Sequence, residues 1–321
     1  MKILVTGNLG YIGPVLASAL MARGHEVHGF DSGLYVSFAS LGLPVVARQT
    51  LADLRDERAL RGAMKPCDAV VHLAAMSNDP LGELDPTLTR EVNLDATLAL
   101  IDAAGTRPLI LYSSASVYGV SVVACDEEAP THPLTLYSEL KVAVERAAFA
   151  RGPSLVLRNG TVHGPAPVIR GDLLLNSMVA SALATGEVVL TTSGLTRRPV
   201  VDVRDLAALT AELIERGTSS LYNVASANVT VGDAAKVVAV ATGAQIIERH
   251  NGADPRDYAM DTSLLRRVVG SSWRQRSLEG SVEDLVRHFR VIGLTAADVA
   301  SRRYHRIVQF QSVQPARVAT H

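Results

Sequence analysis

Residues 1–13 read MKILVTGNLGYIG, and this stretch decides the fold of the chain. Ile3, Leu4 and Val5 form a short apolar run, which is typical of a buried parallel strand. Three glycines follow at a spacing of three residues, and apolar residues then recur with helical period until Gly24. A strand, a glycine-rich turn and a helix in this order predict the first half of a dinucleotide-binding unit.

The glycine turn has the composition of a phosphate-binding site. Gly7, Gly10 and Gly13 let backbone N–H groups approach a pyrophosphate, and the N-terminus of the next helix adds its positive dipole end. Pro14 suits the first helical turn, because a missing N–H is no loss there.

The next strand, expected over residues 26–30, ends at an acid. Asp31 lies 18 residues beyond Gly13, near the position where such folds bind a ribose 2′-hydroxyl. A carboxylate there accepts hydrogen bonds from the ribose diol and repels a 2′-phosphate, which favours NAD over NADP. The alternative is a capping or turn role for Asp31 before Ser32 and Gly33.

Strands and helices are expected to alternate through the first half of the chain. Further strands are expected at 44–47, 68–73, 108–112 and 154–157, and helices at 53–62, 84–104 and 136–151. This alternation predicts an α/β fold with a doubly wound parallel sheet. Later helices are expected at 172–185, 203–216, 231–242 and 281–292, and short strands at 188–191, 199–202, 220–224 and 245–248.

The pattern also suggests how the chain is divided, since prolines and glycines gather just after Gly164 and Pro165. Residues 1–165 are expected to form a Rossmann domain, with segments near 199–224 returning to it. Residues 166–300 mainly form a smaller α/β lobe for the substrate, and 301–321 form a tail. The tail is expected to be solvated or packed on a partner. Its basic residues are Arg302, Arg303, His305, Arg306 and Arg317.

Composition argues against several classes of function. The 321 residues include 31 basic and 32 acidic side chains, for a net charge of −1, so nothing favours nucleic acid or an anionic membrane as a partner. No apolar run approaches the roughly 20 residues of a membrane span, and no signal peptide is expected before the first strand. Cys67 and Cys125 lack metal-ligand spacing, so we expect two thiols, no metal site and a cytoplasmic location.

Three residues form a candidate catalytic set. Tyr137 and Lys141 are four residues apart on a predicted helix, so they share one face. An ammonium beside a phenol lowers the pKa of the phenol, which makes Tyr137 a candidate general acid and base. Ser114 follows the strand expected at 108–112, where ligands bind in parallel sheets, and can hydrogen-bond a substrate oxygen. The alternatives are a surface pair of neighbours and ordinary turn chemistry.

With these motifs, the chain resembles the extended short-chain dehydrogenase/reductases, specifically their NDP-sugar epimerase/dehydratase branch, as far as about residue 292. Thr6 to Gly13 matches the family's glycine turn, and Ser114, Tyr137 and Lys141 match its catalytic residues. The resemblance implies NAD as cofactor. The cofactor contacts that it implies are Gly7, Leu9, Gly10, Tyr11, Ile12, Gly13, Asp31, Asp53, Leu54, Leu73, Ala74, Ala75, Asn93, Tyr137 and Lys141.

The second half carries further motifs that resemble the family's substrate-binding segments. Arg198 begins one of them and Arg256 lies in another, at residues 254–258. The resemblance implies that both hold the diphosphate of a nucleotide sugar through charge-assisted hydrogen bonds. For either arginine, the alternative is a surface charge or an ion pair with Asp202 or Asp257. The other substrate contacts that it implies are Ser77, Ser116, Thr161, His163 and Asn176.

The activities of this family differ in one local feature. Its dehydratases carry Asp-Glu directly after the catalytic serine or threonine, whereas this chain has Ala115 and Ser116. No basic residue that would select NADP accompanies Asp31. Since a reductase that consumes its cofactor would usually use NADPH, an NAD(P)H-dependent NDP-4-keto-sugar reductase is the second choice. We therefore expect an NAD-dependent epimerase that transiently oxidises C4 of an NDP-hexose and returns hydride to the other face. A dehydratase or a non-catalytic NAD(H)-binding protein ranks below both.

The resemblance also implies a homodimer, built from a four-helix bundle of the helices near 86–104 and 136–150. Small and apolar residues there suit such packing, although the same residues would also suit the core of a single chain. They are Ala96, Ala99, Leu100, Ala103, Val142 and Ala143.

Overall fold

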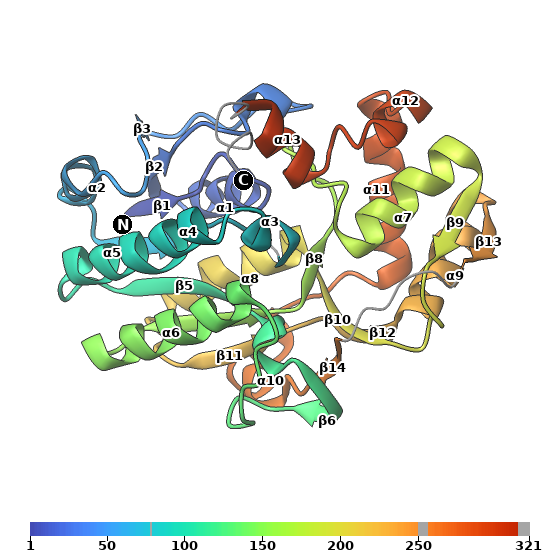
Figure 1. The fold of residues 1–321 in the computed structure, drawn as a ribbon. Coiled ribbons are helices and arrows are strands. Elements are labelled where there is room, and N and C mark those ends of the chain that lie inside the picture. Colours follow the sequence, from blue (N-terminus) through green and yellow to red (C-terminus); the bar gives the residue numbers. More distant parts are fainter. Residues whose placement is uncertain (78, 250–255, 314–321) are drawn as a thin grey trace.

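A seven-stranded parallel sheet with the strand order β11-β7-β5-β4-β1-β2-β3 lies at the centre of the computed structural model, which describes residues 1–77, 79–249 and 256–313 (Figure 1). This is the doubly wound parallel sheet that the alternation of elements predicts. In the order of the sheet, the strands are Leu221–Val224, Leu155–Asn159, Leu109–Ser114, Ala69–His72, Lys2–Thr6, Glu26–Asp31 and Arg48–Leu51.

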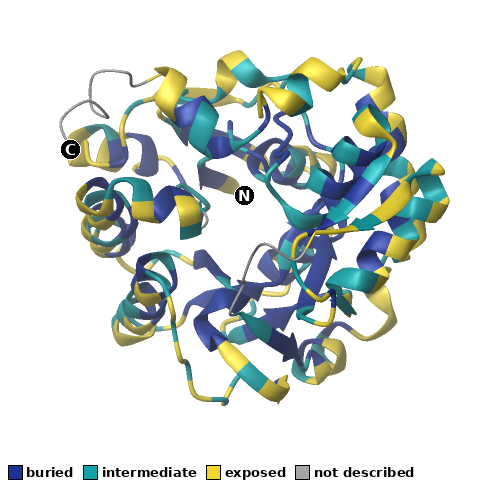
Figure 2. Ribbon diagram, turned by 45° about the vertical axis from the view of Figure 1, so that its right-hand side comes forward, coloured by how far each residue is buried: buried dark blue, intermediate teal, exposed yellow. Residues whose placement is uncertain are grey.

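Helices cover both faces of this sheet because successive residues of a strand point to opposite sides. Ile3 and Val5 belong to one buried cluster, and Leu4 belongs to another on the opposite face. The strands of this sheet are largely buried apart from the edge strand β3, and many of the exposed residues lie on the outer sides of the helices (Figure 2). The first face is covered by α1 (Gly13–Ala22) and α8 (Val203–Glu215), and the second by α2 (Glu57–Met64), α5 (Ala96–Ala104) and α6 (Leu136–Arg151).

The third strand is displaced from its expected position. It is β3, Arg48–Leu51, and it pairs in parallel with residues 28–31. The apolar segment at 44–47 was a misleading signal, because Val45 is 90% exposed and Pro44 has no N–H for a ladder. An edge strand needs no apolar side chains on its outer face, so the polar residues 48–50 serve equally well.

The helix expected at 84–104 is interrupted. α4 (Pro86–Arg90) and α5 are separated by a π-helical turn at Glu91–Asp95. Pro86 begins α4, as its missing N–H requires. Within the turn, the Asn93 side chain bonds to both backbone polar groups of Met76, at 2.8 and 2.9 Å, so the irregular turn fixes the segment that follows β4.

The second half of the chain contributes smaller sheets and a layer of helices, in which the elements expected from the sequence are present with end shifts of up to three residues. β11 joins the main sheet, whereas β10 lies in a three-stranded sheet with β8 and β12. The strands outside the main sheet are β6 (Val120–Cys125), β8 (Thr161–His163), β9 (Glu187–Leu190), β10 (Arg197–Asp202), β12 (Ala227–Thr230), β13 (Gln245–Glu248) and β14 (Asp257–Met260). The helices are α7 (Leu174–Thr185), α9 (Val231–Thr242), α10 (Ser263–Val269), α11 (Leu278–Val291), α12 (Ala296–Ala300) and α13 (Arg306–Val313).

The tail departs most from expectation, because it folds back onto the body of the chain. α13 packs against α3 (Asp79–Leu84) (Figure 1). Tyr304, Ile307 and Phe310 recur at three-residue spacing and present an apolar side to the protein. A solvated or partner-packed tail is therefore wrong for residues 304–310, while Arg317 lies outside the described residues.

Two further features bear on the expected cellular setting. Cys67 and Cys125 are both buried free thiols. Within the described ranges, no helix has the length and apolar character needed to cross a membrane.

Candidate active site

The glycine turn between β1 and α1 is packed too tightly for any side chain. Gly7 has a φ of +74°, and a Cβ there would lie 2.7 Å from the amide nitrogen of Ala74. A Cβ on Gly13 would lie 2.4 Å from the carbonyl oxygen of Gly7. The turn therefore presents bare backbone next to the N-terminus of α1, as a bound pyrophosphate requires.

A cavity of about 210 Å³ lies beside this turn. It brings together most of the residues expected to bind the cofactor. They are Gly7, Gly10, Tyr11, Ile12, Gly13, Asp31, Asp53, Leu54, Leu73, Ala74 and Ala75. The glycine turn, the carboxylate of Asp31 and apolar side chains line one cavity, and this combination of groups fits NAD.

Asp31 ends β2 on the floor of this cavity and already has two backbone partners. Its carboxylate accepts hydrogen bonds from the amides of Leu9, at 3.0 Å, and Gly33, at 2.8 Å. Burial raises the pKa of Asp31, and these two amides oppose the rise. The turn role and the ribose role are therefore compatible, since a carboxylate has about four acceptor positions.

Four expected cofactor contacts lie outside the lining of this cavity: Tyr137 and Lys141, which line the larger cavity described below, and Leu9 and Asn93. Leu9 is buried and acts through its backbone amide on Asp31. Asn93 instead lines a separate enclosed space of about 10 Å³ with Lys141, close to the volume that one water needs. Leu9 and Asn93 therefore contribute by hydrogen-bonding to residues of the lining, Asp31 and Met76.

The three candidate catalytic residues line one cavity of about 630 Å³. Ser114 ends β5, and its hydroxyl shares a 2.8 Å hydrogen bond with that of Ser116. Tyr137 and Lys141 lie on α6, where the lysine Nζ is 5.6 Å from the centroid of the phenol ring. The Thr135 side chain accepts a hydrogen bond from the Ser138 amide and begins the helix.

The electrostatics of this set differ from the sequence prediction. We expected Lys141 to lower the pKa of Tyr137, but burial raises it and the carboxylate of Asp79 raises it further, while Ser114 acts in the opposite direction. Burial also lowers the pKa of Lys141 to about 8. The lysine ammonium donates a 2.7 Å hydrogen bond to the carbonyl oxygen of Tyr112, so in this structure it is directed to the backbone.

Most of the expected substrate contacts line the same large cavity, namely Ser77, Ser116, Thr161, Arg198 and Arg256. The two arginines are adjacent, since Arg198 donates a 2.6 Å hydrogen bond to the carbonyl oxygen of Arg256. Arg256 forms a 2.5 Å ion pair with Asp79. The carboxylates proposed as alternative partners pair elsewhere: Asp202 with Arg204 and Asp257 with Arg197. Asp254 and Pro255 lie outside the described residues.

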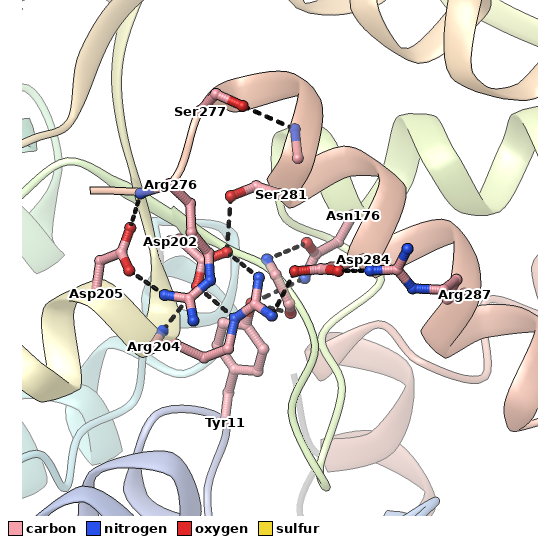
Figure 3. Close-up of polar contacts among 12 residues, drawn as sticks. Tyr11, Asn176, Asp202, Arg204, Asp205, Arg276, Ser277, Ser281, Asp284 and Arg287 are labelled. Carbon is pink, nitrogen blue, oxygen red and sulfur yellow. Dashed lines mark hydrogen bonds and ion pairs between the residues drawn. The ribbon is translucent and has the colours of Figure 1, made fainter. Parts of the chain in front are cut away.

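His163 and Asn176 do not line the large cavity. Asn176 has no exposed surface; its amide donates to the Tyr11 hydroxyl at 3.2 Å and accepts from the Gly164 amide at 3.1 Å. Figure 3 shows this pair beside the network of Asp202, Arg204 and Ser281. The network joins β10 and α8 to α11, whereas Tyr11 joins the glycine turn to Asn176 on α7 (Figure 3). His163 is 2% exposed, and burial lowers its pKa to about 4.

Sequence reasoning missed two groups of residues at the site. Arg170, which is 7% exposed, lines both larger cavities and pairs with Asp172 at 2.6 Å. The second group comes from the tail, and its members are Arg302, His305, Arg306, Ile307, Val308 and Phe310. The basic composition of the tail was visible in the sequence, but its docking depends on contacts made more than 200 residues away.

Comparison with known proteins agrees with this geometry. The model of the "NAD dependent epimerase/dehydratase family" matches residues 3–225. A dTDP-4-dehydro-6-deoxy-D-allose reductase from a Streptomyces species is 27% identical over 320 residues, covering 90% of this chain and 96% of the relative. A UDP-glucose 4-epimerase from Streptomyces lividans is 34% identical over 154 residues, so that the match spans only 45% of either protein.

Solved structures give the same result for the fold. The UDP-glucose 4-epimerase of Thermus thermophilus, determined in complex with NAD, superimposes with a TM-score of 0.77 at 25% identity. That match covers 90% of this chain and 99% of the other. These findings confirm three expectations from the sequence: the family resemblance, the doubly wound fold and NAD dependence.

Proposed function

The chain belongs to the NAD-dependent epimerase/dehydratase family, and we propose that within it the protein is a nucleotide-sugar epimerase acting at C4 of an NDP-hexose. One observation carries the proposal. Ser114, Tyr137 and Lys141 line a single cavity of about 630 Å³, which Arg198 and Arg256 also line. Acid–base groups and cations for a diphosphate therefore face the same space.

The chemistry begins with removal of a proton from the C4 hydroxyl of the sugar. The Tyr137 phenolate accepts this proton, and the Ser114 hydroxyl donates a hydrogen bond to the oxygen as it becomes a carbonyl. Bound NAD supplies the acceptor for the hydride that leaves C4 and returns it in the second half of the reaction. Because burial and Asp79 raise the pKa of Tyr137, the phenolate needs a nearby positive charge, and Lys141, whose Nζ lies 5.6 Å from the ring centroid, is the residue that would supply it.

Epimerisation also requires the keto sugar to present its other face while the nucleotide stays bound. Arg198 and Arg256 suit this task because guanidinium groups bind phosphate oxygens through paired hydrogen bonds. Arg198 is 6% exposed and has Tyr258 beneath it, with 5.8 Å between the guanidinium carbon and the ring centroid. A diphosphate held by this pair would anchor the substrate while the hexose rotates in the wide cavity.

The residues proposed to hold NAD are those that line the smaller cavity, from the glycine turn to Asp31 and residues 73–75. Asp31 would accept hydrogen bonds from the adenosine ribose. The absence of a visible basic partner for a 2′-phosphate next to Asp31 in the sequence supports NAD as the working cofactor.

Reduction of an NDP-4-keto sugar is the second candidate. It is favoured by the relative that matches over 320 residues, which is a 4-keto-sugar reductase. Dehydration is a weaker candidate, because Ala115 and Ser116, which follow Ser114, have no carboxylate to remove a second proton.

The first experiment is to denature the purified protein and identify any released nicotinamide cofactor by mass spectrometry. An epimerase regenerates its cofactor in each turnover, so near-stoichiometric NAD is expected. Cofactor-free protein that binds NADPH more tightly than NADH would support the reductase instead. Cofactor-free protein without affinity for either would support a non-catalytic role.

The second experiment is to incubate the protein with UDP-, dTDP-, GDP- and CDP-hexoses and to follow the C4 epimers by NMR. We expect at least one of these sugars to reach an equilibrium mixture of epimers without added cofactor. The epimerase proposal fails if all remain unchanged while a 4-keto sugar is reduced with added NAD(P)H.

We also propose a cytoplasmic homodimer that pairs through α5 and α6. Leu98 on α5 and Phe149 on α6 are 39% and 42% exposed, which supports an apolar contact surface on these helices. Ala96, Leu100 and Val142 are buried within the single chain, so they would not contribute to it. Ala99, Ala103 and Ala143 remain half-buried. Light scattering on the purified protein tests the assembly.

A further inference from the structure

The C-terminal helix α13 forms part of the wall of the cofactor cavity. Arg306 and Phe310 line the cavity that also holds the glycine turn and Asp31. Neighbouring residues of the same segment, among them His305 and Ile307, line the larger cavity. Phe310 is 2% exposed and packs with Met76 and Leu88. Helix α13, near the end of the described chain, therefore lines the same cavity as the glycine turn near its start.

Arg306 is the unusual residue of this wall, because its guanidinium is buried beside an aromatic ring and a neutral amide. The residue is 2% exposed, and its guanidinium carbon lies 3.8 Å from the centroid of the Tyr35 ring. Its hydrogen-bond acceptor is the side-chain oxygen of Gln309, at 2.8 Å. Among the residues that the structure describes, Arg306 forms no ion pair. A buried cation in this state is unfavourable unless an anion joins it.

A second guanidinium adds to the positive charge of the wall. Arg170 pairs with Asp172 and donates a 3.2 Å hydrogen bond to the Ser77 hydroxyl. It lies close enough to Arg306 for repulsion between them to lower the pKa of Arg306, after the larger effect of burial. Asp31, the acid nearest to the glycine turn, is already held by two backbone amides. Arg306 and Arg170 thus place two guanidinium groups in the lining of the cavity that also includes the glycine turn.

We propose that Arg306 pairs with the diphosphate of NAD, so that docking of α13 and retention of the cofactor are coupled. The inference rests on the proposed function, because it takes NAD to be the resident cofactor. It also predicts slow NAD release, because α13 is held by Phe310 in an apolar cluster and the bound diphosphate would add an ion pair to this docking. Slow release suits a cofactor that is regenerated in each turnover and does not need to leave the protein.

The main test compares Arg306→Gln with Arg303→Gln. Arg303 is a matched control, because it lies three residues away in the same segment but its side chain is 58% exposed and pairs with Asp298. Each purified protein is loaded with NAD, and exchange with isotopically labelled NAD is followed by mass spectrometry. We expect Arg306→Gln to release NAD about 10- to 100-fold faster than the wild type, as for loss of a hydrogen-bonded charge. Arg303→Gln should stay within about twofold of the wild type.

Two competing ligands identify the group that Arg306 recognises. ADP-ribose carries the diphosphate and adenosine does not, so Arg306→Gln should weaken ADP-ribose binding and leave adenosine binding unchanged. Equal weakening of both ligands would overturn a diphosphate contact. Weakening confined to NADP would assign Arg306 to a 2′-phosphate and would equally overturn it.

Limited proteolysis of the wild type tests the coupling without any variant. Saturating NAD should slow tryptic cleavage after Arg302 and Arg303, because a docked α13 holds this segment in place. Cleavage that is unaffected by NAD would overturn the coupling even if Arg306→Gln does not fold. If the wild type retains NAD and Arg306→Gln retains it equally well, this inference fails and the proposed function stands. If the wild type binds no NAD, the proposed function fails first.

Discussion

The hydroxyl of Tyr11 donates a 2.7 Å hydrogen bond to the carbonyl oxygen of Gly164, 153 residues further along the chain. Tyr11 lies in the glycine turn, whereas Gly164 follows β8 at the edge of the substrate cavity. Gly164 has a φ of +109°, and a Cβ there would lie 2.9 Å from the carboxylate of Asp202. A single buried phenol therefore connects the glycine turn to the segment that follows β8.

Replacing Tyr11 by Phe should lower both stability and cofactor affinity. The change leaves the buried Gly164 carbonyl and the Asn176 amide without their phenol partner, at a cost of about 1–3 kcal/mol in the free energy of unfolding. Urea denaturation and NAD titration measure the two effects. Tyr222→Phe is the control, because Tyr222 lies on β11, outside the lining of both cavities. Unchanged NAD affinity in Tyr11→Phe would contradict a role of this connection in cofactor binding.

Replacing Tyr137 by Phe should abolish turnover but leave the cofactor in place. Loss of a general acid and base lowers kcat by about 10²- to 10⁴-fold. The variant keeps the aromatic ring, whose centroid lies 5.6 Å from the Lys141 Nζ, and loses only the hydroxyl group. Epimerisation is followed by NMR, and bound NAD by mass spectrometry after denaturation. Activity close to that of the wild type would remove Tyr137 from the mechanism.

Replacing Asp79 by Asn should shift the activity profile to lower pH. The carboxylate of Asp79 raises the pKa of Tyr137, so its neutralisation favours the phenolate. The acid limb of kcat/KM should move down by up to about one pH unit. Glu83→Gln is the control, since Glu83 also lies on α3 and accepts a 3.1 Å hydrogen bond from the Leu136 amide at the start of α6. A limb that moves equally in both variants would argue against a specific effect of Asp79.

The alkaline side of the same profile should report Lys141. Burial lowers its pKa to about 8, so the ammonium that supports the phenolate is lost above that pH. We expect kcat/KM to fall above about pH 8. In Lys141→Arg the limb should disappear, at lower overall activity, because a guanidinium does not titrate in this range. A limb that persists in this variant must come from another group.

Stability should decrease in mild acid because three buried histidines resist protonation. Burial lowers the pKa of His72 to about 3 and those of His163 and His288 to about 4. The unfolded chain therefore binds more protons below about pH 6.5, and stability that is complete above this pH is lost as the pH falls towards 4. Each histidine contributes about 1.4 kcal/mol per pH unit in this window.

Urea unfolding at pH 7, 6 and 5 measures this slope. His163→Asn should reduce it by about one histidine's share. An identical slope in this variant would show that His163 does not contribute to acid sensitivity.

Much of the fold and of the catalytic set could be predicted because local rules determine them. Glycines are required at positions 7 and 13, because a Cβ at either position would lie less than 3 Å from backbone atoms. Helix α6 has the bounds expected from the sequence, and the four-residue spacing of Tyr137 and Lys141 then places both on one wall. The carboxyl ends of β2 and β5 likewise bring Asp31 and Ser114 to the expected edge of the sheet.

The remaining features depend on contacts between distant residues, which spacing does not encode. The pKa of Tyr137 reflects burial and the position of Asp79, and neither follows from the Tyr–Lys interval. Asn176 looked like a ligand contact, but its amide bonds to Tyr11 and Gly164. The π-helical turn around Asn93 was hidden because its apolar residues continue the helical pattern on both sides.

Besides residues between 73 and 92 and Arg170, the cofactor cavity takes its walls from two segments that are far apart in the sequence, residues 7–55 and residues 306–310. During translation, at about 5–20 residues per second, roughly 10–50 s separate the synthesis of these two segments. A nascent chain could form the central sheet through β7 while its nucleotide site still lacked one side. Tight cofactor capture would then require that residues 306–310 have been synthesised and docked.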